Sequence, residues 1–184
     1  MTIPNPYFKN VPGFGDLKME QVIVDYVYPL LSVLRDKKGG RYLCMCFDTR
    51  GAQQWLVTPV SIQALTALLK NEVTLSSPFE DPRTLKMRIT MDYHTRQEFF
   101  QGLTAKQIPK EELPEPGEYL DAEPGEWAEY IKMLNLAHLR QTSGIGVHKA
   151  SVHYGGVRGV PAVKWESCNH QHRKEGRYVV CAAG

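Results

Sequence analysis

The sequence predicts an α+β protein, in which an antiparallel sheet of at least four strands is covered by two helices and followed by a small β-rich C-terminal unit. Three observations support this prediction. Residues 22–69 contain three apolar runs that are separated by polar turns and followed by an amphipathic helix. Residues 84–92 alternate between apolar and polar side chains, as a half-buried strand does. Residues 124–141 repeat apolar side chains at helical spacing.

The first three strands are expected over residues 22–34, 41–47 and 53–60. Gly39 and Gly40 supply the turn between the first two strands, because glycine tolerates the backbone angles of tight turns. Both faces of the second strand are apolar, with Tyr42, Cys44 and Cys46 on one side and Leu43, Met45 and Phe47 on the other. A strand of this kind lies in the middle of a sheet that is covered on both sides.

The two covering helices are expected over residues 61–71 and 124–141. Ser61 stands at the N-cap of the first helix, where its hydroxyl can accept a hydrogen bond from a free amide of the first turn. Pro124 suits the first position of the second helix, since its missing N–H would have no partner there in any case. A shorter helix is expected over residues 95–103.

The alternation in residues 84–92 assigns each side chain of this strand to one of two faces. One face carries Leu85, Met87, Ile89 and Met91, and the other carries Lys86, Arg88 and Thr90. We expect the apolar face to be buried. Lys86 and Arg88 are therefore expected to point into solvent.

The composition is that of a globular protein, with 42% hydrophobic and 23% charged residues in a chain of 184. We expect an extended arm over residues 1–20, an α+β core domain over residues 21–141 and a basic β-hairpin unit over residues 142–184. No apolar run approaches the roughly 20 residues of a membrane helix, and the N-terminus lacks the features of a secretory signal. The four cysteines form no disulfide pattern. These observations predict a cytoplasmic protein with no membrane partner and no cofactor.

Charge is distributed unevenly along the chain. Residues 1–141 carry a net charge of −2, whereas residues 142–184 carry +4 and four of the six histidines. The basic residues of this tail, which alternate with Tyr154, Trp165 and Tyr178, are Arg158, Lys164, Arg173, Lys174 and Arg177. Proteins that bind single-stranded nucleic acid combine basic and aromatic side chains in this way. Nucleic-acid binding through the tail is therefore one hypothesis, although a small hairpin also needs aromatic residues for its own core.

The tail also contains a candidate metal site. In an extended segment Cys168, His170 and His172 lie on one side, and a paired strand would bring Cys181 near them. Thiolate and imidazole are suitable ligands for zinc. The spacing matches none of the usual zinc motifs, however, so we predict a polar hairpin loop with exposed histidines and no metal.

The patterns of known catalytic sites are missing from the sequence. A nucleophilic pair could combine Cys168 or Cys181 with His148 or His153, but no local signature of such an enzyme surrounds them. The residues Asp92 and His94 are better explained as a polar strand end. The sequence contains no phosphate-binding loop, no dinucleotide fingerprint after a strand and no zinc-protease motif. We predict no catalytic residues, and an enzyme that depends on cysteine, histidine or zinc ranks third among the functions.

The function that the sequence favours is binding to another protein. Acidic residues are spread through residues 111–129, in a proline-containing segment with aromatic side chains. The predicted partner-binding residues are Glu112, Glu115, Glu118, Tyr119 and Trp127. Aromatic side chains anchor interfaces, and acidic charge guides the encounter with a basic protein surface. The alternative is that Tyr119 and Trp127 only pack the second helix onto the sheet.

Two stretches resemble known proteins. The pattern YPLL…D…GG-RYL…F-D…W-LVTPVS…L-ALL…PF over residues 28–79 and the segment ELPEPGEYL over residues 112–120 resemble a family of small bacterial and phage-associated domains without assigned function. The shared residues belong to turns and core, so the resemblance implies no catalytic residue. The small size and the core with a divergent tail are also similar to phage inhibitors of bacterial defence, including anti-CRISPR proteins. This likeness implies an inhibitor or regulator of a nucleic-acid-handling host complex, such as a CRISPR effector.

Zinc content tests the interpretation of the tail motif. We expect the purified protein to contain no stoichiometric zinc by elemental analysis. We also expect its melting temperature to stay unchanged on chelation, because structural zinc contributes folding free energy directly. About one equivalent of zinc that the Cys168→Ser variant loses would contradict this prediction.

Overall fold

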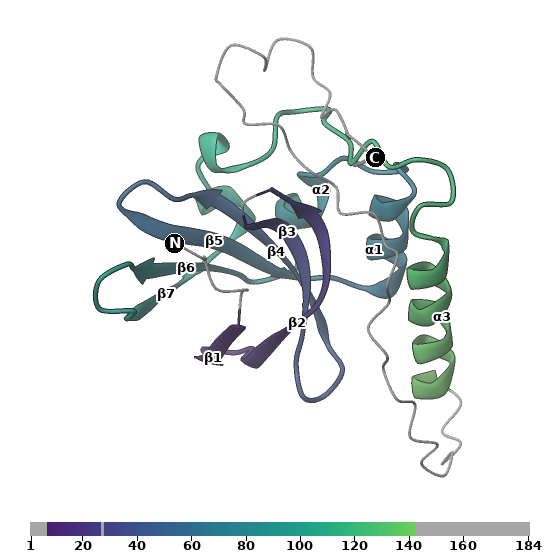
Figure 1. Cartoon of the computed structure of the whole chain (residues 1–184), viewed down its shortest axis with the longest axis horizontal. Coiled ribbons are helices and arrows are strands. Elements are labelled where there is room, and N and C mark those ends of the chain that lie inside the picture. Colours follow the sequence, from purple (N-terminus) through teal and green to yellow (C-terminus); the bar gives the residue numbers. More distant parts are fainter. Residues whose placement is uncertain (1–6, 27, 143–184) are drawn as a thin grey trace.

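The computed structural model describes residues 7–26 and 28–142, which form one seven-stranded antiparallel sheet with helices on one face (Figure 1). Each strand pairs with its neighbours in the sequence, in the order β1-β2-β3-β4-β5-β6-β7. The strands are β1 (Tyr7–Val11), β2 (Gly15–Asp25), β3 (Pro29–Arg35), β4 (Arg41–Asp48), β5 (Ala52–Pro59), β6 (Lys86–Asp92) and β7 (Glu98–Leu103). The predicted antiparallel sheet is confirmed, and it is more extensive than the four strands that the sequence required.

The sheet curls until its two edge strands approach each other, so that it is nearly barrel-shaped (Figure 1). The two edge strands are close enough for their charges to interact. Burial raises the pKa of Glu98 on β7, and the positive charge of Lys9 on β1 offsets part of that rise. Leu85 lies 3.7 Å from the position of a Cβ on Gly102 and 3.9 Å from that of a Cβ on Gly13. The turn after β1 and the last strand therefore flank the same side chain.

Each face of the sheet has its own hydrophobic core. All seven strands contribute to the inner core on the face that the curl encloses, where Trp55 meets Phe8 edge-on with ring centroids 5.1 Å apart. In β4, the inner core receives Tyr42, Cys44 and Cys46, whereas Leu43, Met45 and Phe47 join the outer core. The predicted division of this strand is confirmed, because β4 is the middle strand and is covered on both sides.

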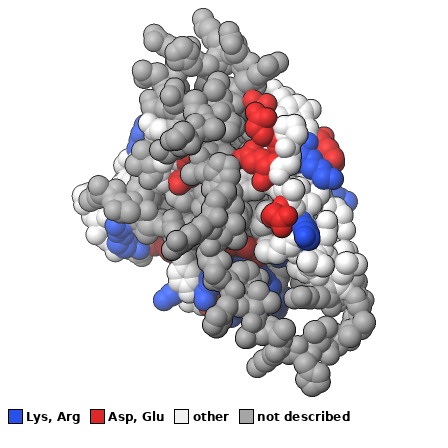
Figure 2. All heavy atoms as spheres, turned by 45° about the vertical axis from the view of Figure 1, so that its right-hand side comes forward, with Lys and Arg blue, Asp and Glu red and all other residues white. Residues whose placement is uncertain are grey.

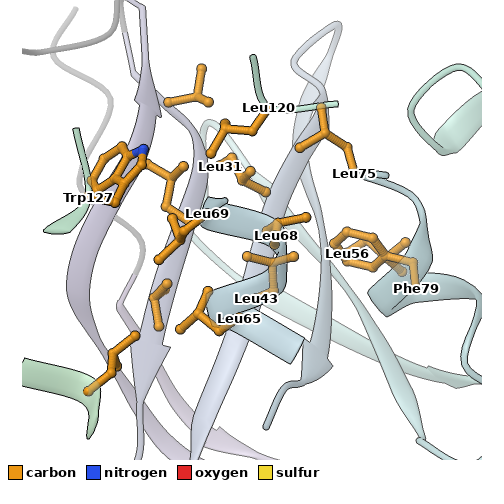
Figure 3. Packing of buried hydrophobic residues seen from close by; sticks show 14 of the residues in the cluster. Leu31, Leu43, Leu56, Leu65, Leu68, Leu69, Leu75, Phe79, Leu120 and Trp127 are labelled. Carbon is orange, nitrogen blue, oxygen red and sulfur yellow. The ribbon is translucent and has the colours of Figure 1, made fainter. Parts of the chain in front are cut away.

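Three helices cover the outer face of the sheet. They are α1 (Ile62–Leu69), the single-turn α2 (Ser77–Glu80) and α3 (Ala128–Thr142), and two short 3₁₀ turns, η1 (Ala105–Gln107) and η2 (Lys110–Glu112), precede α3. Figure 3 shows Leu65, Leu68 and Leu69 of α1 lying over Leu43 and Leu56 of the sheet. The two covering helices predicted from the sequence are confirmed as α1 and α3. No helix among the described residues is long and apolar enough to span a membrane.

The single strand predicted over residues 22–34 is wrong, because the chain reverses between β2 and β3. Pro29 begins β3 and cannot donate a backbone hydrogen bond, and the Tyr26 amide donates to the Tyr28 carbonyl at 3.2 Å. Strand β2 also begins earlier than predicted, at Gly15. Residues 7–20, which were expected to belong to an extended arm, therefore form β1 and the first half of β2.

The helix predicted over residues 95–103 is also wrong, since β7 occupies most of this range. The carboxylate of Asp92 accepts hydrogen bonds from the His94 and Thr95 amides, at 2.9 and 2.8 Å, and so closes a tight hairpin turn after β6. The adjacent aromatic residues Phe99 and Phe100 favour a strand. The helix predicted over residues 124–141 begins later than expected. Residues 123–127 form turns, and α3 begins at Ala128.

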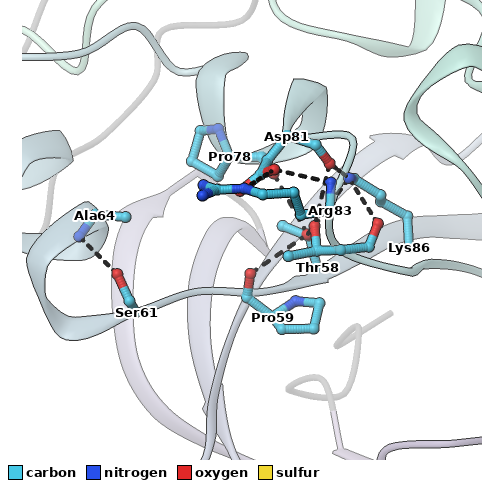
Figure 4. Close-up of polar contacts among 9 residues, drawn as sticks. Thr58, Pro59, Ser61, Ala64, Pro78, Asp81, Arg83 and Lys86 are labelled. Atoms are coloured by element: carbon cyan, nitrogen blue, oxygen red, sulfur yellow. Dashed lines mark hydrogen bonds and ion pairs between the residues drawn. The ribbon is translucent and has the colours of Figure 1, made fainter.

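Lys86 is completely buried rather than outward-facing. Its Nζ donates to the Thr84 carbonyl at 2.8 Å, to the Thr84 hydroxyl at 2.9 Å and to the Asp81 carbonyl (Figure 4). Burial lowers the pKa of Lys86, and the charge of Asp81 partly offsets that effect. Leu85, predicted to be buried, is 47% exposed because β6 begins only at Lys86. Within β6 the predicted alternation holds only from Met87 onward.

The N-cap of α1 gives a direct stability test. The Ala64 amide donates to the Ser61 hydroxyl at 3.1 Å, as predicted (Figure 4). We expect Ser61→Ala to lower the free energy of unfolding by about 1 kcal/mol in urea denaturation, because this amide loses its acceptor. Ser61→Asp retains an acceptor and should stay close to the wild type. Equal stability of Ser61→Ala and Ser61→Asp would contradict the role of the cap.

Candidate functional site

The most distinctive surface is an acidic segment, residues 111–129, which runs from η2 to the first turn of α3. It carries eight Asp and Glu residues and no Lys or Arg. Figure 2 shows acidic side chains gathered on the face of the molecule that carries α3. Five of the eight are exposed, and these are Glu111, Glu115, Asp121, Glu123 and Glu129.

Hydrogen bonds to the connection after α1 hold the acidic segment in place. The side chain of Asn71 donates to the Ala122 carbonyl at 2.9 Å and accepts from the Ala122 amide at 3.2 Å. The Leu75 amide donates to the Glu118 carbonyl at 2.8 Å. Leu120 and Trp127 are each only 4% exposed and anchor the segment in the outer core (Figure 3). The segment therefore presents its charges from a fixed backbone.

The five predicted partner-binding residues divide between the interior and the surface. Glu112 accepts from the guanidinium of Arg88 with both carboxylate oxygens, at 2.7 and 2.5 Å. Glu118 is 6% exposed and accepts from the Glu115 amide at 3.0 Å, and Trp127 packs in the core. Tyr119 is 44% exposed, and Glu115 is also exposed.

Sequence reasoning missed several of the acidic residues that reach the surface. Asp121 and Glu123 are exposed where the segment meets α3, and neither was selected in advance. Asp121 has a φ of 59°, which lies in the left-handed region that few residues other than glycine, asparagine and aspartate adopt. Gly117 and Gly125 indicate irregular backbone on either side of these residues, but they do not predict exposure, since Glu118 and Leu120 between them are buried.

A hollow of about 670 Å³ lies between the end of α1, the acidic segment and α3. Its apolar lining includes Leu69, Trp127, Ile131, Leu136 and Leu139, and Glu123 lies at its border. Leu136 is 49% exposed and Leu139 is 58% exposed, so α3 presents apolar side chains at the surface as well as toward the sheet. We call this hollow the α1–α3 groove.

One polar atom in the wall of the α1–α3 groove lacks a partner. Trp127 lines the groove, and its buried Nε1 forms no hydrogen bond with any residue that the structure describes. An indole N–H is a donor only, and a buried donor without an acceptor is costly. Because Nε1 has almost no exposed surface, an acceptor in the groove would reach it only after the indole turned.

Two of the residues weighed as catalytic, Asp92 and His94, lie at the end of β6 and in the turn that follows it. Asp92 closes the β6–β7 turn, and His94 is an exposed residue of that turn. Among residues 7–26 and 28–142, no group of three or more His, Cys, Asp or Glu side chains is placed to hold a metal ion. The remaining candidates lie outside the described residues: His148, His153, Arg158, Lys164, Cys168, His170, His172, Arg173, Lys174, Arg177 and Cys181.

Comparison with known proteins identifies the family. A model of DUF6575, a family of unknown function, matches residues 7–147. The chain belongs to the DUF6575 family. The DUF6575 match begins with β1 and ends shortly after α3, so it includes every described strand and helix. This match confirms the predicted resemblance to a family without assigned function. No curated protein and no solved structure matches the chain.

Cysteine reactivity tests the environment of β4. Burial, with the charge of Asp48 as a smaller cause, raises the pKa of Cys46 to about 12, and burial also raises the pKa of Cys44. Both groups should therefore remain thiols at about pH 8, and the thiolate is the reactive form. We expect mass-spectrometric mapping to find both unmodified by N-ethylmaleimide in the folded protein and modified in guanidinium. Rapid modification of either in the folded protein would contradict the structure.

Proposed function

We propose that this protein is a non-enzymatic binding module that captures a basic, amphipathic segment of another protein. The observation that carries this proposal is the position of the acidic segment beside the α1–α3 groove. Apolar side chains of the partner would enter the groove, while its Lys and Arg side chains would meet the exposed carboxylates. Interfaces commonly combine an apolar centre with a charged rim of this kind.

The chemistry of the groove favours a polypeptide as the occupant. Its lining is largely apolar, with Leu69, Ile131 and Leu136 among the residues that face it. Leu136 and Leu139 present apolar area at the surface, as a helix-binding groove does. Tyr119, exposed on the same segment as the carboxylates, supplies an aromatic contact.

The fixed backbone of the acidic segment supports the same proposal. Binding is weakened by the entropy lost when loops become ordered at an interface. The contacts of Asn71 with Ala122 and of Leu75 with Glu118 already order this segment without a partner. Most of that cost is therefore met in folding rather than in binding.

The wider role that we propose is inhibition or regulation of a nucleic-acid-handling complex, such as a CRISPR effector, by a cytoplasmic protein of a bacterium or mobile element. Proteins that bind nucleic acid present Lys- and Arg-rich surfaces, which suit an acidic docking site. The alternative is that this protein binds nucleic acid itself through its basic tail, with Arg158, Lys164 and Arg173 among the contacts. Nuclease treatment distinguishes the two functions. A protein partner would still be captured after the treatment, whereas partners held through nucleic acid would be lost.

Two pairs of isosteric substitutions test the docking surface. Asp121→Asn with Glu123→Gln removes two charges beside the groove and keeps the side-chain shapes. The matched control is Glu72→Gln with Glu80→Gln, which removes two exposed charges outside the acidic segment. With a synthetic amphipathic helix of Lys and Leu as the probe, we expect the first pair to slow association several-fold at low salt in stopped-flow fluorescence. The control pair should leave the rate unchanged.

A groove variant and a nuclease arm complete the test. Leu136→Asp places a charge on the exposed apolar surface of α3, and it should weaken binding of the same probe without lowering the melting temperature. A host protein captured from nuclease-treated lysate should be lost in both the groove variant and the charge variant. Equal capture by wild type and both variants, or capture that depends on nucleic acid, would contradict the docking proposal.

A further inference from the structure

A β-bulge places one carboxylate under α3, on the other side of the helix from the α1–α3 groove. Met19 pairs with Leu34 and Gln21 pairs with Val33, so Glu20 is an extra residue in β2. Bulges redirect side chains and are common beside functional sites. The redirected carboxylate lies among residues of β3, β4 and α3.

The Glu20 carboxylate uses only one of its two oxygens. Its Oε1 accepts from Nε of Arg41 at 2.8 Å and from the Tyr130 hydroxyl at 2.9 Å. Burial and the charge of Glu20 raise the pKa of Tyr130, so this phenol remains a donor. Oε2 is buried and has no hydrogen-bond partner among the described residues, and the nearest cation, Nε of Arg35, is 3.7 Å away.

Two guanidinium groups share this one carboxylate. The Arg41 side chain is 3% exposed and the Glu20 side chain is 11% exposed, so their ion pair is largely shielded from water. Arg35, by contrast, has a 46% exposed side chain and forms only the longer contact. A guanidinium carries five N–H groups, so the exposed Arg35 retains donors for a further anion.

These residues border a hollow of about 640 Å³, a volume typical of small-molecule sites. The charged side chains of its lining are balanced, with Lys18, Arg35, Lys37 and Arg41 against Asp16, Glu20, Asp36 and Glu129. Several are already engaged: Asp16 pairs with Lys37 at 2.7 Å, and Asp36 accepts from the Lys38 and Gly40 amides. Met19, Met133 and Ala137 form an apolar wall. We call this hollow the Glu20 cleft.

We propose that the Glu20 cleft binds a small amino-acid-like zwitterion with an apolar side chain. The Glu20 side chain, which is 11% exposed, would turn its buried Oε2 toward the ammonium group, and the ligand's carboxylate would accept from the exposed guanidinium of Arg35. The apolar side chain would lie against Met19 and Met133. A ligand with no net charge suits a lining whose charges are balanced, and it supplies a donor for Glu20 and an acceptor for Arg35.

A purely structural role explains only part of this arrangement. The bonds of Oε1 tie α3 to the sheet and neutralise the buried Arg41, as any buried ion pair requires. They do not account for a second oxygen without a partner beside an arginine that reaches solvent. The zwitterion accounts for both.

Three probes of matched shape test the ligand class by isothermal titration with the full chain. They are L-leucine, 4-methylpentanoate, which lacks the amino group, and isopentylamine, which lacks the carboxylate. We expect L-leucine to bind, and each single-charge analogue to bind weaker by about tenfold or more, since each loses a charge-assisted hydrogen bond. Absent binding of L-leucine, or equal binding of either analogue, would overturn the proposal.

Two variants assign the binding to the cleft. Arg35→Ala removes an exposed cation and should abolish the advantage of L-leucine over isopentylamine. Lys38→Ala, which removes an exposed cation from the adjacent turn outside the cleft lining, should leave binding unchanged. Glu20→Gln should remove the advantage of L-leucine over 4-methylpentanoate, because an amide nitrogen replaces the acceptor. Unchanged discrimination in both cleft variants would place L-leucine elsewhere and overturn the assignment. This result is independent of the docking proposal, which concerns the other side of α3.

Discussion

The whole fold depends on a sheet that is apolar on both faces. A strand such as β4 leaves no side to water, so the sheet needs two covers. It meets this need in two different ways. One face curls around an inner core to which every strand contributes, and the other is covered by α1, α2, α3 and the acidic segment. The position of the candidate docking surface follows, since the segment that carries the charges also carries Leu120 and Trp127 into the outer core.

Features of the fold that depend on nearby residues could be predicted from the sequence. The alternation in β4 and the cap formed by Ser61 each involve side chains within a few positions of one another. Features that depend on distant contacts could not. The sequence pattern predicts that Lys86 is exposed to solvent. In the structure its Nζ is buried and donates hydrogen bonds to the Asp81 and Thr84 carbonyls. In the same way, the sequence predicts a helix over residues 95–103, but β7 forms a strand that pairs along its length with β6.

The candidate site shows the same limit. The acidic residues and the aromatic residues of residues 111–129 were visible in the sequence, but their exposure was not. Glu112 is engaged by Arg88, which lies 24 positions earlier in the chain. The contact between Asn71 and Ala122 spans 51 positions, and that between Tyr130 and Glu20 spans 110. Spacing along the chain contains no information about such pairs, so neither the α1–α3 groove nor the Glu20 cleft could be inferred before the fold was known.

Among the described residues, six have buried polar side-chain atoms without a hydrogen-bond partner, and two of these six line the hollows. Lys86 shows that this fold can satisfy a buried cation completely with nearby oxygens. Against that standard, the partnerless Nε1 of Trp127 and Oε2 of Glu20 are exceptions, and each lies in a residue that lines a hollow large enough for a ligand. Four other residues, Gln53, Thr66, Arg88 and Glu126, also have a buried polar atom without a partner among the described residues, and none of them lines either hollow. An unsatisfied group therefore indicates a binding site here only where space for a partner adjoins its residue, and this condition separates Trp127 and Glu20 from the other four residues.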